Sequence, residues 1–584
     1  MAFSLTAILG WGQERFKVNL DNIALETWCL PNVQGATQGY LTRLVNLTNN
    51  DSQPHLVSLR LVKEFDRYPG NIGEISKTVM LAPHEKATIK LRAWCRLNIP
   101  RVLRVVVDGA VQDDQIMTDT VSYYSYSSGL VKTGLLLSHD AGKHQEVFKE
   151  IVEKAVDQLG LSSSGYGRNW DYYFSISANP IEHWGDDWLD YTVFNIVVLS
   201  GREWSSLNEE KRDCLWRFLE TGGILILMDG EAQVPQPWRA RKRTTANETS
   251  YYVGFGRLVL MGPSISGSDP EFFFEILKDA RQGGTEGQKR AELTNLNQGF
   301  SIVGKLTVPL RGFFLLMLAF VVLLGPVNML VLGRKNRKIW LLATIPLISL
   351  GGTLAVLIYA IATEGLRPTI RREGLTILDE SARKAITIGS GGVYAPLTLG
   401  ERLRFDPDTE LRLYIPYSQR DWATVDWTEG QSLTGGWVVS RLPFRYQTRC
   451  VETRRERLTV SGTETEGFQI VNGFGVPIES LLLADGQGAV YRAEQVAPGQ
   501  KVGVQRLPQV PEGDDAADSL RILFESDWTL PHPAVTPDNP FNLRLPPNTY
   551  LAVLQGAPFM DAPLAANAHQ KARSLVYGIR GTEP

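Results

Sequence analysis

The stretch FFLLMLAFVVLLGPVNMLVLGRKNRKIWLLATIPLISLGGTLAVLIYAIA, residues 313–362, decides the fold class of this chain. It contains two uncharged apolar runs, 313–332 and 339–362. Each run is close to the roughly 20 residues that a helix needs to cross a bilayer core. A buried helix of a soluble domain is the alternative, but two such runs in succession are unusual inside a soluble domain. The sequence therefore predicts a transmembrane helical hairpin over 313–362.

A short basic loop joins the two predicted helices. Its cations are Arg334, Lys335, Arg337 and Lys338. The loop is too short to leave the membrane surface, so the regions before and after the hairpin are expected on the same side. The positive-inside rule favours a cytoplasmic loop and extracytoplasmic domains in a bacterial inner membrane. Cations also flank the outer ends of the hairpin, which leaves the opposite orientation open.

The two apolar runs contain several helix-breaking, small and polar residues. Pro is tolerated in membrane helices because neighbouring helices and Ser or Thr side chains can satisfy the freed carbonyl groups. Small residues let membrane helices approach closely. We therefore predict helix packing at Gly325, Pro326, Asn328, Pro346, Gly351 and Gly352, and docking of a membrane partner at the GPVN stretch, residues 325–328.

Composition excludes several classes of function. The chain has 584 residues and a formal net charge of −3, so it lacks the basic excess typical of a general nucleic-acid binder. No GxxxxGK[ST] motif occurs, so any ATPase of a complex containing this chain is expected to be another subunit. With 7 histidines in no compact ligand pattern, we predict neither a metal site nor a cofactor.

The first part of the chain is expected to be rich in antiparallel β structure. Residues 1–14 are interpreted as a leader remnant or a disordered start, since they lack a basic segment and a clear cleavage site. Alternating segments such as HLVSLRLVK and ATIKLRAW predict an immunoglobulin-like β-sandwich over 15–128. Matching Trp-Cys pairs allow a disulfide between Cys29 and Cys95, and two separate buried thiols are the alternative.

The hydrophobic period then changes. Continuous apolar strands such as TGLLL and GGILILMDG alternate with amphipathic segments such as KHQEVFKEIVEKAVDQLG, which predicts an open α/β sheet over 130–300. After the hairpin, alternating segments with Gly, Pro and Asn turns predict one or two further β-sandwich domains over 370–584. Residues 508–548 are rich in Pro and Asp and are expected to form a long loop or a hinge.

Three stretches carry a resemblance to a known group of proteins. They are LSGREWSSLNEEKRDCLWRFLETGG, the GPVN of the first apolar run together with the basic loop of the hairpin, and QIVNGFGVPIESLLLADGQGAVYRAEQVAPGQKV. The chain resembles bacterial membrane-anchored proteins that accompany ABC transporters and contain a domain similar to class I glutamine amidotransferases. The resemblance implies an auxiliary subunit of a membrane complex, with an ABC-type permease or another envelope complex as partner.

Residues at predicted strand ends are the candidates for a ligand crevice, because ligands bind at the carboxyl edge of α/β sheets. They are His139, Asp140, Ser200, Arg202 and Asp229, with Glu231 nearby. Helix capping and loop formation are the structural alternative. Active amidotransferases place a nucleophilic cysteine at a strand end, where this chain has Ser200, and Cys214 is expected in a helix core. We therefore predict no catalytic residue of that class.

The stretch PIEHWGDDWLDY, residues 180–191, concentrates carboxylates and aromatic side chains. Two carboxylates that flank a glycosidic bond are the signature of glycosidases, but Asp186, Asp187 and Asp190 come from one short connection. The plain interpretation is a loop helix with Trp184 and Trp188 packed into the domain, and partner docking is the second.

Three classes of function remain after the sequence has been considered. The first is a non-catalytic, membrane-anchored scaffold or accessory subunit. The second is a cell-envelope protein that binds a glycan or another ligand, and the third is a membrane-bound hydrolase. The missing catalytic constellation and the order of domains favour the first class.

Overall fold

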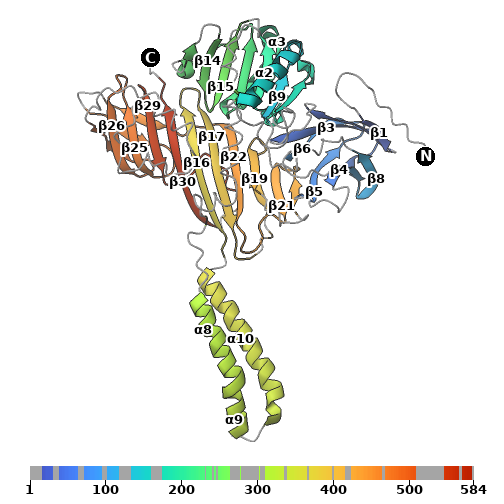
Figure 1. Ribbon diagram of the computed structural model, residues 1–584, viewed down its shortest axis with the longest axis vertical. Helices are drawn as coiled ribbons and strands as arrows, with labels where there is room; N and C mark the ends of the chain where they lie inside the picture. Colours follow the sequence, from blue (N-terminus) through green and yellow to red (C-terminus); the bar gives the residue numbers. More distant parts are fainter. Residues whose placement is uncertain are drawn as a thin grey trace.

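The computed structural model describes twenty-one segments of the chain. They are residues 16–20, 22–30, 39–62, 72–94, 102–117, 133–158, 174–230, 232–239, 242–244, 248–262, 276–277, 302, 310–334, 338–364, 367–397, 400, 402–414, 423–462, 467–507, 545–564 and 568–581. Residues 1–14 and most of the Pro-rich stretch 508–548 lie outside them. The described part confirms a multidomain, sheet-rich protein with two apolar helices (Figure 1).

The N-terminal region forms two facing sheets. One has the order β1-β2-β3-β6, with bounds β1 (Phe16–Leu20), β2 (Ile23–Leu30), β3 (Tyr40–Asn49) and β6 (Lys86–Trp94). The other contains β4 (His55–Val62), β5 (Glu74–Leu81), β7 (Val102–Val107) and β8 (Ala110–Met117). Leu25 and Leu47 of the first sheet share a buried core with Leu59 and Val105 of the second. Burial of alternate residues therefore produces a β-sandwich-like domain.

Three strands from the region after the hairpin extend the second sheet. They are β18 (Leu403–Phe405), β20 (Thr424–Asp426) and β21 (Gln431–Gly435), and the full order is β18-β21-β20-β5-β4-β7-β8. Strand β20 pairs in parallel with β5 through Thr424 and Glu74. Gly73 N also donates to Ala423 O at 2.8 Å. The two predicted β regions, 15–128 and 370–584, therefore share one sheet.

The α/β region contains a seven-stranded sheet of order β10-β9-β11-β12-β15-β14-β13. Strands β10, β9, β11, β12 and β15 pair in parallel, and β14 and β13 are antiparallel. The strand bounds are β9 (Thr133–Leu137), β10 (Phe174–Ala178), β11 (Ile196–Ser200), β12 (Ile224–Met228), β13 (Lys242–Thr244), β14 (Glu248–Val253) and β15 (Gly256–Met261). The helices are α1 (His139–Gly142), α2 (Gln145–Gln158), α3 (Gly201–Ser206), α4 (Glu209–Glu220), α5 (Gln236–Arg239), η4 (Ile181–His183) and η5 (Trp188–Tyr191).

Both faces of the central strands are buried, as continuous apolar strands predict. Leu135 and Val198 face one way and pack with Phe148 of α2. Leu136 and Val197 face the other way and share a core with α4. The predicted alternation of strands and helices therefore yields a mostly parallel sheet with helices on both faces.

The predicted hairpin consists of two apolar helical rods. The first contains α8 (Leu310–Val322), a π-helical turn η7 (Leu323–Val327) and α9 (Asn328–Arg334), and the second contains η8 (Lys338–Trp340) and α10 (Leu341–Glu364). The apolar windows Phe314–Arg334 and Leu341–Tyr359 are long enough to cross a membrane, and 6% and 0% of them is buried inside the protein. Helices of this hydropathy that expose their side chains require an apolar environment.

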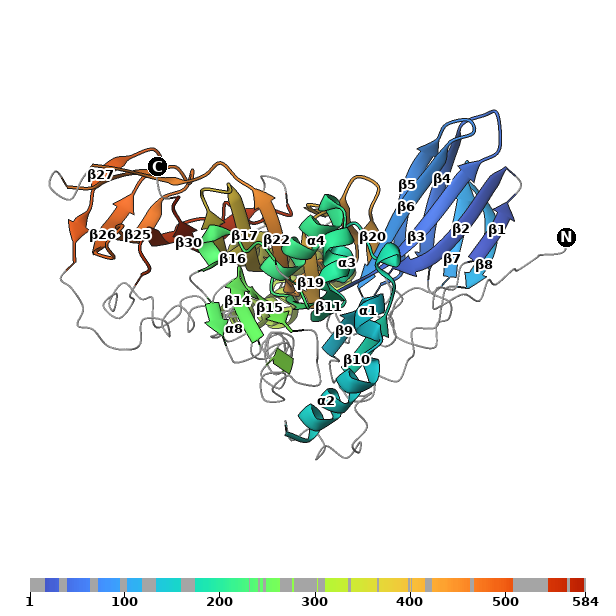
Figure 2. The same cartoon turned by 90° about the horizontal axis from the view of Figure 1, so that it is seen from above.

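The region after the hairpin is a nine-stranded sheet of order β19-β22-β17-β16-β30-β29-β25-β26-β28, accompanied by a small sheet β23-β24-β27. The bounds are β16 (Thr369–Asp379), β17 (Lys384–Tyr394), β19 (Glu410–Tyr414), β22 (Phe444–Thr453), β23 (Leu458–Ser461), β24 (Gln469–Asn472), β25 (Ile478–Ala484), β26 (Val490–Val496), β27 (Lys501–Gly503), β28 (Gln505–Arg506), β29 (Thr549–Leu554) and β30 (His569–Ile579). Figure 2 shows the N-terminal sandwich and strands β25 to β27 at opposite ends of the body, with the α/β region between them.

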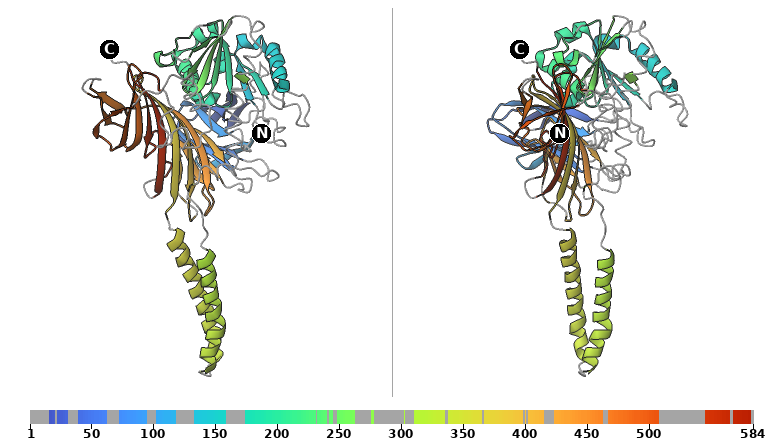
Figure 3. Two further views of the ribbon diagram at one scale, coloured as in Figure 1. Left: turned by 60° about the vertical axis from the view of Figure 1, so that its left-hand side comes forward. Right: turned by 90° about the vertical axis from the view of Figure 1, so that its left-hand side faces the viewer.

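The sheet-rich body lies beyond one end of the hairpin, and the end of α9 at Arg334 lies at the other (Figure 3). The domains before and after the hairpin therefore occur on one side of it, as the short loop predicts. Lys335 and Arg337 of that loop lie outside the described residues, and Arg334 is exposed at the end of α9.

Candidate functional site

Two of the residues predicted for a ligand crevice lie together where β9 and β11 end. Ser200 Oγ lies 3.0 Å from Asp140 Oδ2 and 3.0 Å from Glu203 Oε2, and it accepts a hydrogen bond from Glu203 N at 3.2 Å. Ser200 is the N-cap of α3, and Glu203 returns a bond to Ser200 N, which completes a capping box. Ser138 caps α1 by accepting a hydrogen bond from Ala141 N, and its hydroxyl donates to Glu203. The structure therefore brings Asp140 and Ser200 together as part of two linked helix caps.

The remaining predicted crevice residues lie at the periphery. His139, Arg202 and Asp229 are exposed, and Glu231 lies outside the described residues. The hydrogen bond from Lys143 lowers the pKa of Asp140. An ionised carboxylate with a lowered pKa is a weak base, so this geometry stabilises loops better than it activates a serine. Sequence reasoning missed Ser138 and Glu203, although the S-x-x-E spacing of 200–203 is a capping-box signal.

Cys214 lies in the helix core, as predicted. Its side chain in α4 is 8% exposed, and burial raises the pKa of the thiol to about 12. A thiol with so high a pKa supplies little thiolate near neutral pH, and the thiolate is the nucleophile. The predicted disulfide stays a prediction because Cys95 lies outside the described residues. In the structure, the Cys29 sulfur accepts a hydrogen bond from Arg43 Nη2 at 3.2 Å.

The segment 180–191 holds three regions of the chain together. Trp184 and Trp188 are 3% and 2% exposed, so the plain interpretation of this stretch is confirmed. The carboxylates, however, point toward the N-terminal sandwich. Thr42 Oγ1 of β3 donates to Asp190 Oδ1 at 2.6 Å. We call the contacts of this segment with β3, β6 and the β18–β21 region the junction.

Two cations of β6 face the three carboxylates at the junction. Lys90 Nζ lies 3.7 Å from Asp190 Oδ2 and also contacts Asp186. Arg92 Nη2 lies 3.7 Å from Asp190 Oδ1 and also contacts Asp187. Asp190 is fully buried, and burial raises its pKa while the two cations oppose that shift. Its Oδ2 atom makes no hydrogen bond with the described residues. The charges of Lys90 and Arg92 therefore offset the cost of burying this carboxylate.

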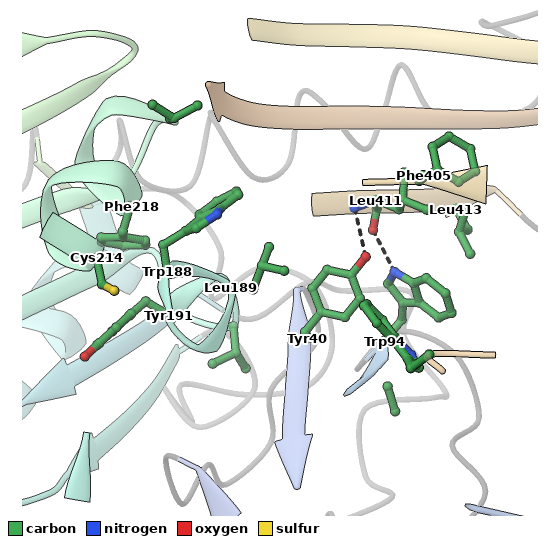
Figure 4. Packing of buried hydrophobic residues seen from close by; sticks show 14 of the residues in the cluster. Tyr40, Trp94, Trp188, Leu189, Tyr191, Cys214, Phe218, Phe405, Leu411 and Leu413 are labelled. Atoms are coloured by element: carbon green, nitrogen blue, oxygen red, sulfur yellow. Dashed lines mark hydrogen bonds between the residues drawn. The ribbon is translucent and has the colours of Figure 1, made fainter. Parts of the chain in front are cut away.

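A third region closes the junction from the other side. Tyr40 Oη accepts hydrogen bonds from Leu411 N at 2.9 Å and from Gln431 Nε2 at 2.6 Å. Trp94 Nε1 donates to Leu411 O at 2.7 Å, beside the Tyr40 ring. Figure 4 shows Tyr40 and Trp94 reaching Leu411, with Trp188, Leu189 and Tyr191 packed on the other side of Tyr40. The aromatic side chains thus join buried apolar area to specific hydrogen bonds across three regions.

Close backbone approach also fixes the junction. Tyr40 N donates to Thr192 Oγ1 at 3.0 Å. Gly39 precedes it with φ of +66°, and a Cβ there would lie 2.2 Å from the Thr192 carbonyl carbon. A residue with a side chain would therefore force the sandwich and the α/β region apart.

The α/β region contacts the nine-stranded sheet through a further charged pair. Lys384 Nζ lies 3.1 Å from Glu220 Oε1, whose carboxylate is 6% exposed. Burial raises the pKa of Glu220, and the charge of Lys384 opposes the shift. Arg449 Nη1 also donates to Thr221 O at 3.3 Å. All three soluble regions are therefore in direct polar contact.

An open groove lies on the outer side of α3 and α4. Its volume is about 1210 Å³, and it is lined by Trp204, Ser205, Asn208, Glu209, Glu210, Arg212, Asp213, Trp216 and Gln233. The rings of Trp204 and Trp216 meet edge to face, with centroids 6.2 Å apart. Indole rings beside carboxylates are typical of surfaces that bind sugars or cationic groups.

Inside the membrane hairpin, the predicted packing residues divide into two groups. Asn328 is 7% exposed, and its Nδ2 donates to Thr344 Oγ1 of the other helix at 3.0 Å. A Cβ on Gly352 would lie 2.4 Å from the Phe320 ring, so this glycine lies in the helix contact. Gly325 and Gly351 face open space. Pro326 lies in the π-helical turn and Pro346 inside α10.

Comparisons with known proteins do not place the chain in a family. No family model and no curated protein matches the sequence. Among solved structures, the trimeric lipoprotein SadB of Salmonella enterica matches with a TM-score of 0.11 and 16% identity, covering 16% of this chain and 55% of that chain. The yeast delta-COP-I mu-homology domain in complex with a Dsl1 WxWxV peptide matches with a TM-score of 0.19 and 7% identity, covering 36% and 96%. TM-scores this low do not establish a shared fold.

Proposed function

We propose that the protein is a non-catalytic, membrane-anchored scaffold or accessory subunit of a bacterial envelope complex. The observation that carries the proposal is the pairing of two exposed apolar helices with a body whose three regions are locked by buried polar contacts. A rigid body on a two-helix anchor holds binding surfaces at a fixed height above a bilayer. It needs no catalytic centre to do so.

The proposed partner is an ABC-type permease or another membrane-embedded subunit. The resemblance in domain order to amidotransferase-like auxiliary proteins favours this partner. The immunoglobulin-like sandwich and the degenerate amidotransferase-like sheet belong to the same proposal. Ser200 stands at the strand end where active amidotransferases have cysteine, and its hydroxyl caps a helix. Gly325 and Gly351 leave room on the outer side of the hairpin, which suits close approach of a partner helix.

The body is proposed to lie on the extracytoplasmic side of the inner membrane. The compact basic loop Arg334, Lys335, Arg337 and Lys338 supports this side through the positive-inside rule. A reporter fused at Asn336 tests the orientation directly. A cytoplasmic signal agrees with the proposal, and an external signal reverses it.

Extraction of the native protein in a mild detergent, followed by identification of co-purifying chains, tests the scaffold proposal. We expect a stoichiometric complex with membrane subunits of a transporter or another envelope machine. A variant with one charged residue in the hairpin contact, Gly352→Glu, should lose that complex more readily than Ser206→Glu, which changes an exposed residue of α3. A monodisperse lone protein in native extracts would contradict the proposal.

A second candidate function is recognition of a glycan or another ligand at the groove beside α3 and α4. The edge-to-face pair Trp204 and Trp216, together with Glu209 and Asp213, favours it. Titration of envelope glycan fragments while Trp fluorescence is recorded tests this candidate. Trp216→Ala should abolish any saturable change in fluorescence. Replacement of Trp437, which lies between β21 and β22, should not. The third class is a membrane-bound hydrolase. It predicts that replacing Ser200, Asp229 or His139 with Ala lowers the rate of turnover.

A further inference from the structure

Two loops at one end of the nine-stranded sheet expose large apolar side chains. Leu397 follows β17 and is 57% exposed, and Leu442 precedes β22 and is 44% exposed. Among the described residues outside the hairpin, the other exposed large apolar side chains are Leu56, Met80 and Val111, all in the N-terminal sandwich. Single exposed apolar side chains are common at protein surfaces, so it is the position of these two leucines relative to the hairpin that distinguishes them.

The two loops are fastened to each other. Arg441 N donates to Ala395 O at 2.8 Å, and Ser440 Oγ donates to Pro396 O at 2.5 Å. Beneath them, the buried rings of Trp437 and Phe444 meet edge to face with centroids 5.8 Å apart. The geometry therefore holds Leu397 and Leu442 beside each other on a firm base.

The position of these loops follows from the chain path out of the membrane. Helix α10 ends at Glu364 and β16 begins at Thr369, and five Cα–Cα steps span at most about 18 Å. Thr369 pairs with Tyr394, the last residue of β17, and Val393 pairs with Phe444. The tips of β16, β17 and β22 accordingly form the part of the body nearest the helices in both views of Figure 3.

The length of α10 places this end of the body at the bilayer surface. Its 24 residues give about 36 Å at about 1.5 Å per residue, whereas the hydrocarbon core is about 30 Å thick. The last turn of α10 therefore reaches the headgroup layer. Two exposed arginines accompany the leucines: Arg367 lies between α10 and β16, and Arg441 precedes Leu442. Apolar tips flanked by arginines match the chemistry of an anionic phospholipid interface.

We propose that Leu397 and Leu442 form a second membrane contact, which inserts into the interfacial layer of the bilayer that α10 has just crossed. This contact rests on the proposed membrane anchoring and goes beyond it, since it fixes the orientation of the body against the bilayer. Surfaces such as the groove at α3 and α4 are then presented at one height and in one orientation.

Depth-dependent quenching in reconstituted protein tests the contact. Single cysteines at Leu397 and at Leu442 carry an environment-sensitive fluorophore in a Cys29→Ser, Cys95→Ser background. Cys214 and Cys450 stay because they are only 8% and 5% exposed. The vesicles contain phosphatidylethanolamine and phosphatidylglycerol with a doxyl-labelled lipid. We expect blue-shifted emission at both positions and strong quenching by doxyl groups near the headgroups.

Two reference labels make the result decisive. Leu347→Cys, on the exposed surface of α10, reports whether the hairpin is inserted, and Ser206→Cys on α3 reports a surface far from the helices. If Leu347 is quenched while Leu397 and Leu442 behave like Ser206, the second contact is refuted and the anchoring stands. If Leu347 itself escapes quenching, the anchoring fails. Blue-shifted emission at Leu397 and Leu442 without lipid quenching would indicate a protein contact and would also overturn the proposal.

Discussion

In the part of the chain that the structure describes, the junction contains many polar side-chain contacts, whereas the hairpin contains few. At the junction, five charged side chains and several aromatic hydroxyl and indole groups meet between regions that are far apart in the sequence. In the hairpin, a side-chain hydrogen bond between Asn328 and Thr344 joins the two rods. If the hairpin is anchored in a membrane as proposed, the bilayer contributes most of its stability, whereas the body depends on its own buried contacts. Substitutions at the junction should therefore cost more than substitutions in the hairpin.

The largest effect is expected for Asp190→Ala. The substitution leaves Arg92 and Lys90 without their shared buried carboxylate and leaves the Thr42 hydroxyl without its acceptor. Removing one partner of a buried charged pair costs about 3–5 kcal/mol. Urea denaturation followed by Trp fluorescence should show the loss, together with faster proteolysis between the sandwich and the α/β region.

Asp186→Ala provides the matched control for this prediction. Asp186 contacts the same Lys90, but its side chain is 59% exposed. Exposed ion pairs contribute about 0–1 kcal/mol, so the control should unfold close to the wild type. Equal losses for the two variants would show that the junction is not held by its buried charge.

Ser200→Ala should have an intermediate effect. The hydroxyl caps α3 and contacts Asp140, and loss of an N-cap costs about 0.5–2 kcal/mol. Thermal unfolding of the soluble body measures the change, and Ser200→Thr should recover much of it because Thr also caps helices. Complex formation should be unaffected. A loss of function with unchanged stability would instead favour the hydrolase class.

Local patterns in the sequence predict the hairpin and the mostly parallel sheet, because both depend on runs of neighbouring residues. The S-x-x-E spacing at 200–203 likewise predicts the capping box at the start of α3. The sequence does not reveal that β20 joins β5, since a three-residue strand has no distinctive pattern and its partner is some 350 residues away. Nor does it reveal that Tyr40 meets Leu411 and that Asp190 meets Arg92. These contacts depend on tertiary packing, which no local period encodes.

Asn328→Ala tests the other side of the comparison. Interhelical hydrogen bonds in membranes contribute about 0.6 kcal/mol on average and at most about 1.7. In bicelles, the variant should lower the free energy of unfolding of the hairpin by about 0.6 kcal/mol. Thr344→Ala should match it, and the double variant should add little because the two side chains share one bond. Thr353→Ala removes a hydroxyl bonded within its own helix and serves as the control.

The smallest effect, and one confined to a pH window, is expected at His55. Its Nδ1 lies 2.6 Å from Asp108 Oδ2 and its Nε2 lies 3.1 Å from Asp51 Oδ2 at the surface of the sandwich. Hydrogen bonds to Asp108 and Asp51 raise the pKa of His55 from 6.5. A raised pKa means that the folded state favours the charged ring. The stabilisation is therefore complete below about pH 6.5 and is lost as pH rises through the folded value.

His55→Gln should remove this pH dependence. The difference in Tm between wild type and variant should be largest in mildly acidic buffer and shrink toward alkaline pH. Asp108→Asn should lose much of the same dependence, because it removes the closest carboxylate while Asn still tolerates the positive φ of 50° at this position. The pKa of Asp108 is itself lowered by His55, so its own contribution disappears as acid protonates it. A Tm difference that grows as pH rises above about 6.5 would contradict this assignment, because a raised histidine pKa gives the opposite sign in that range.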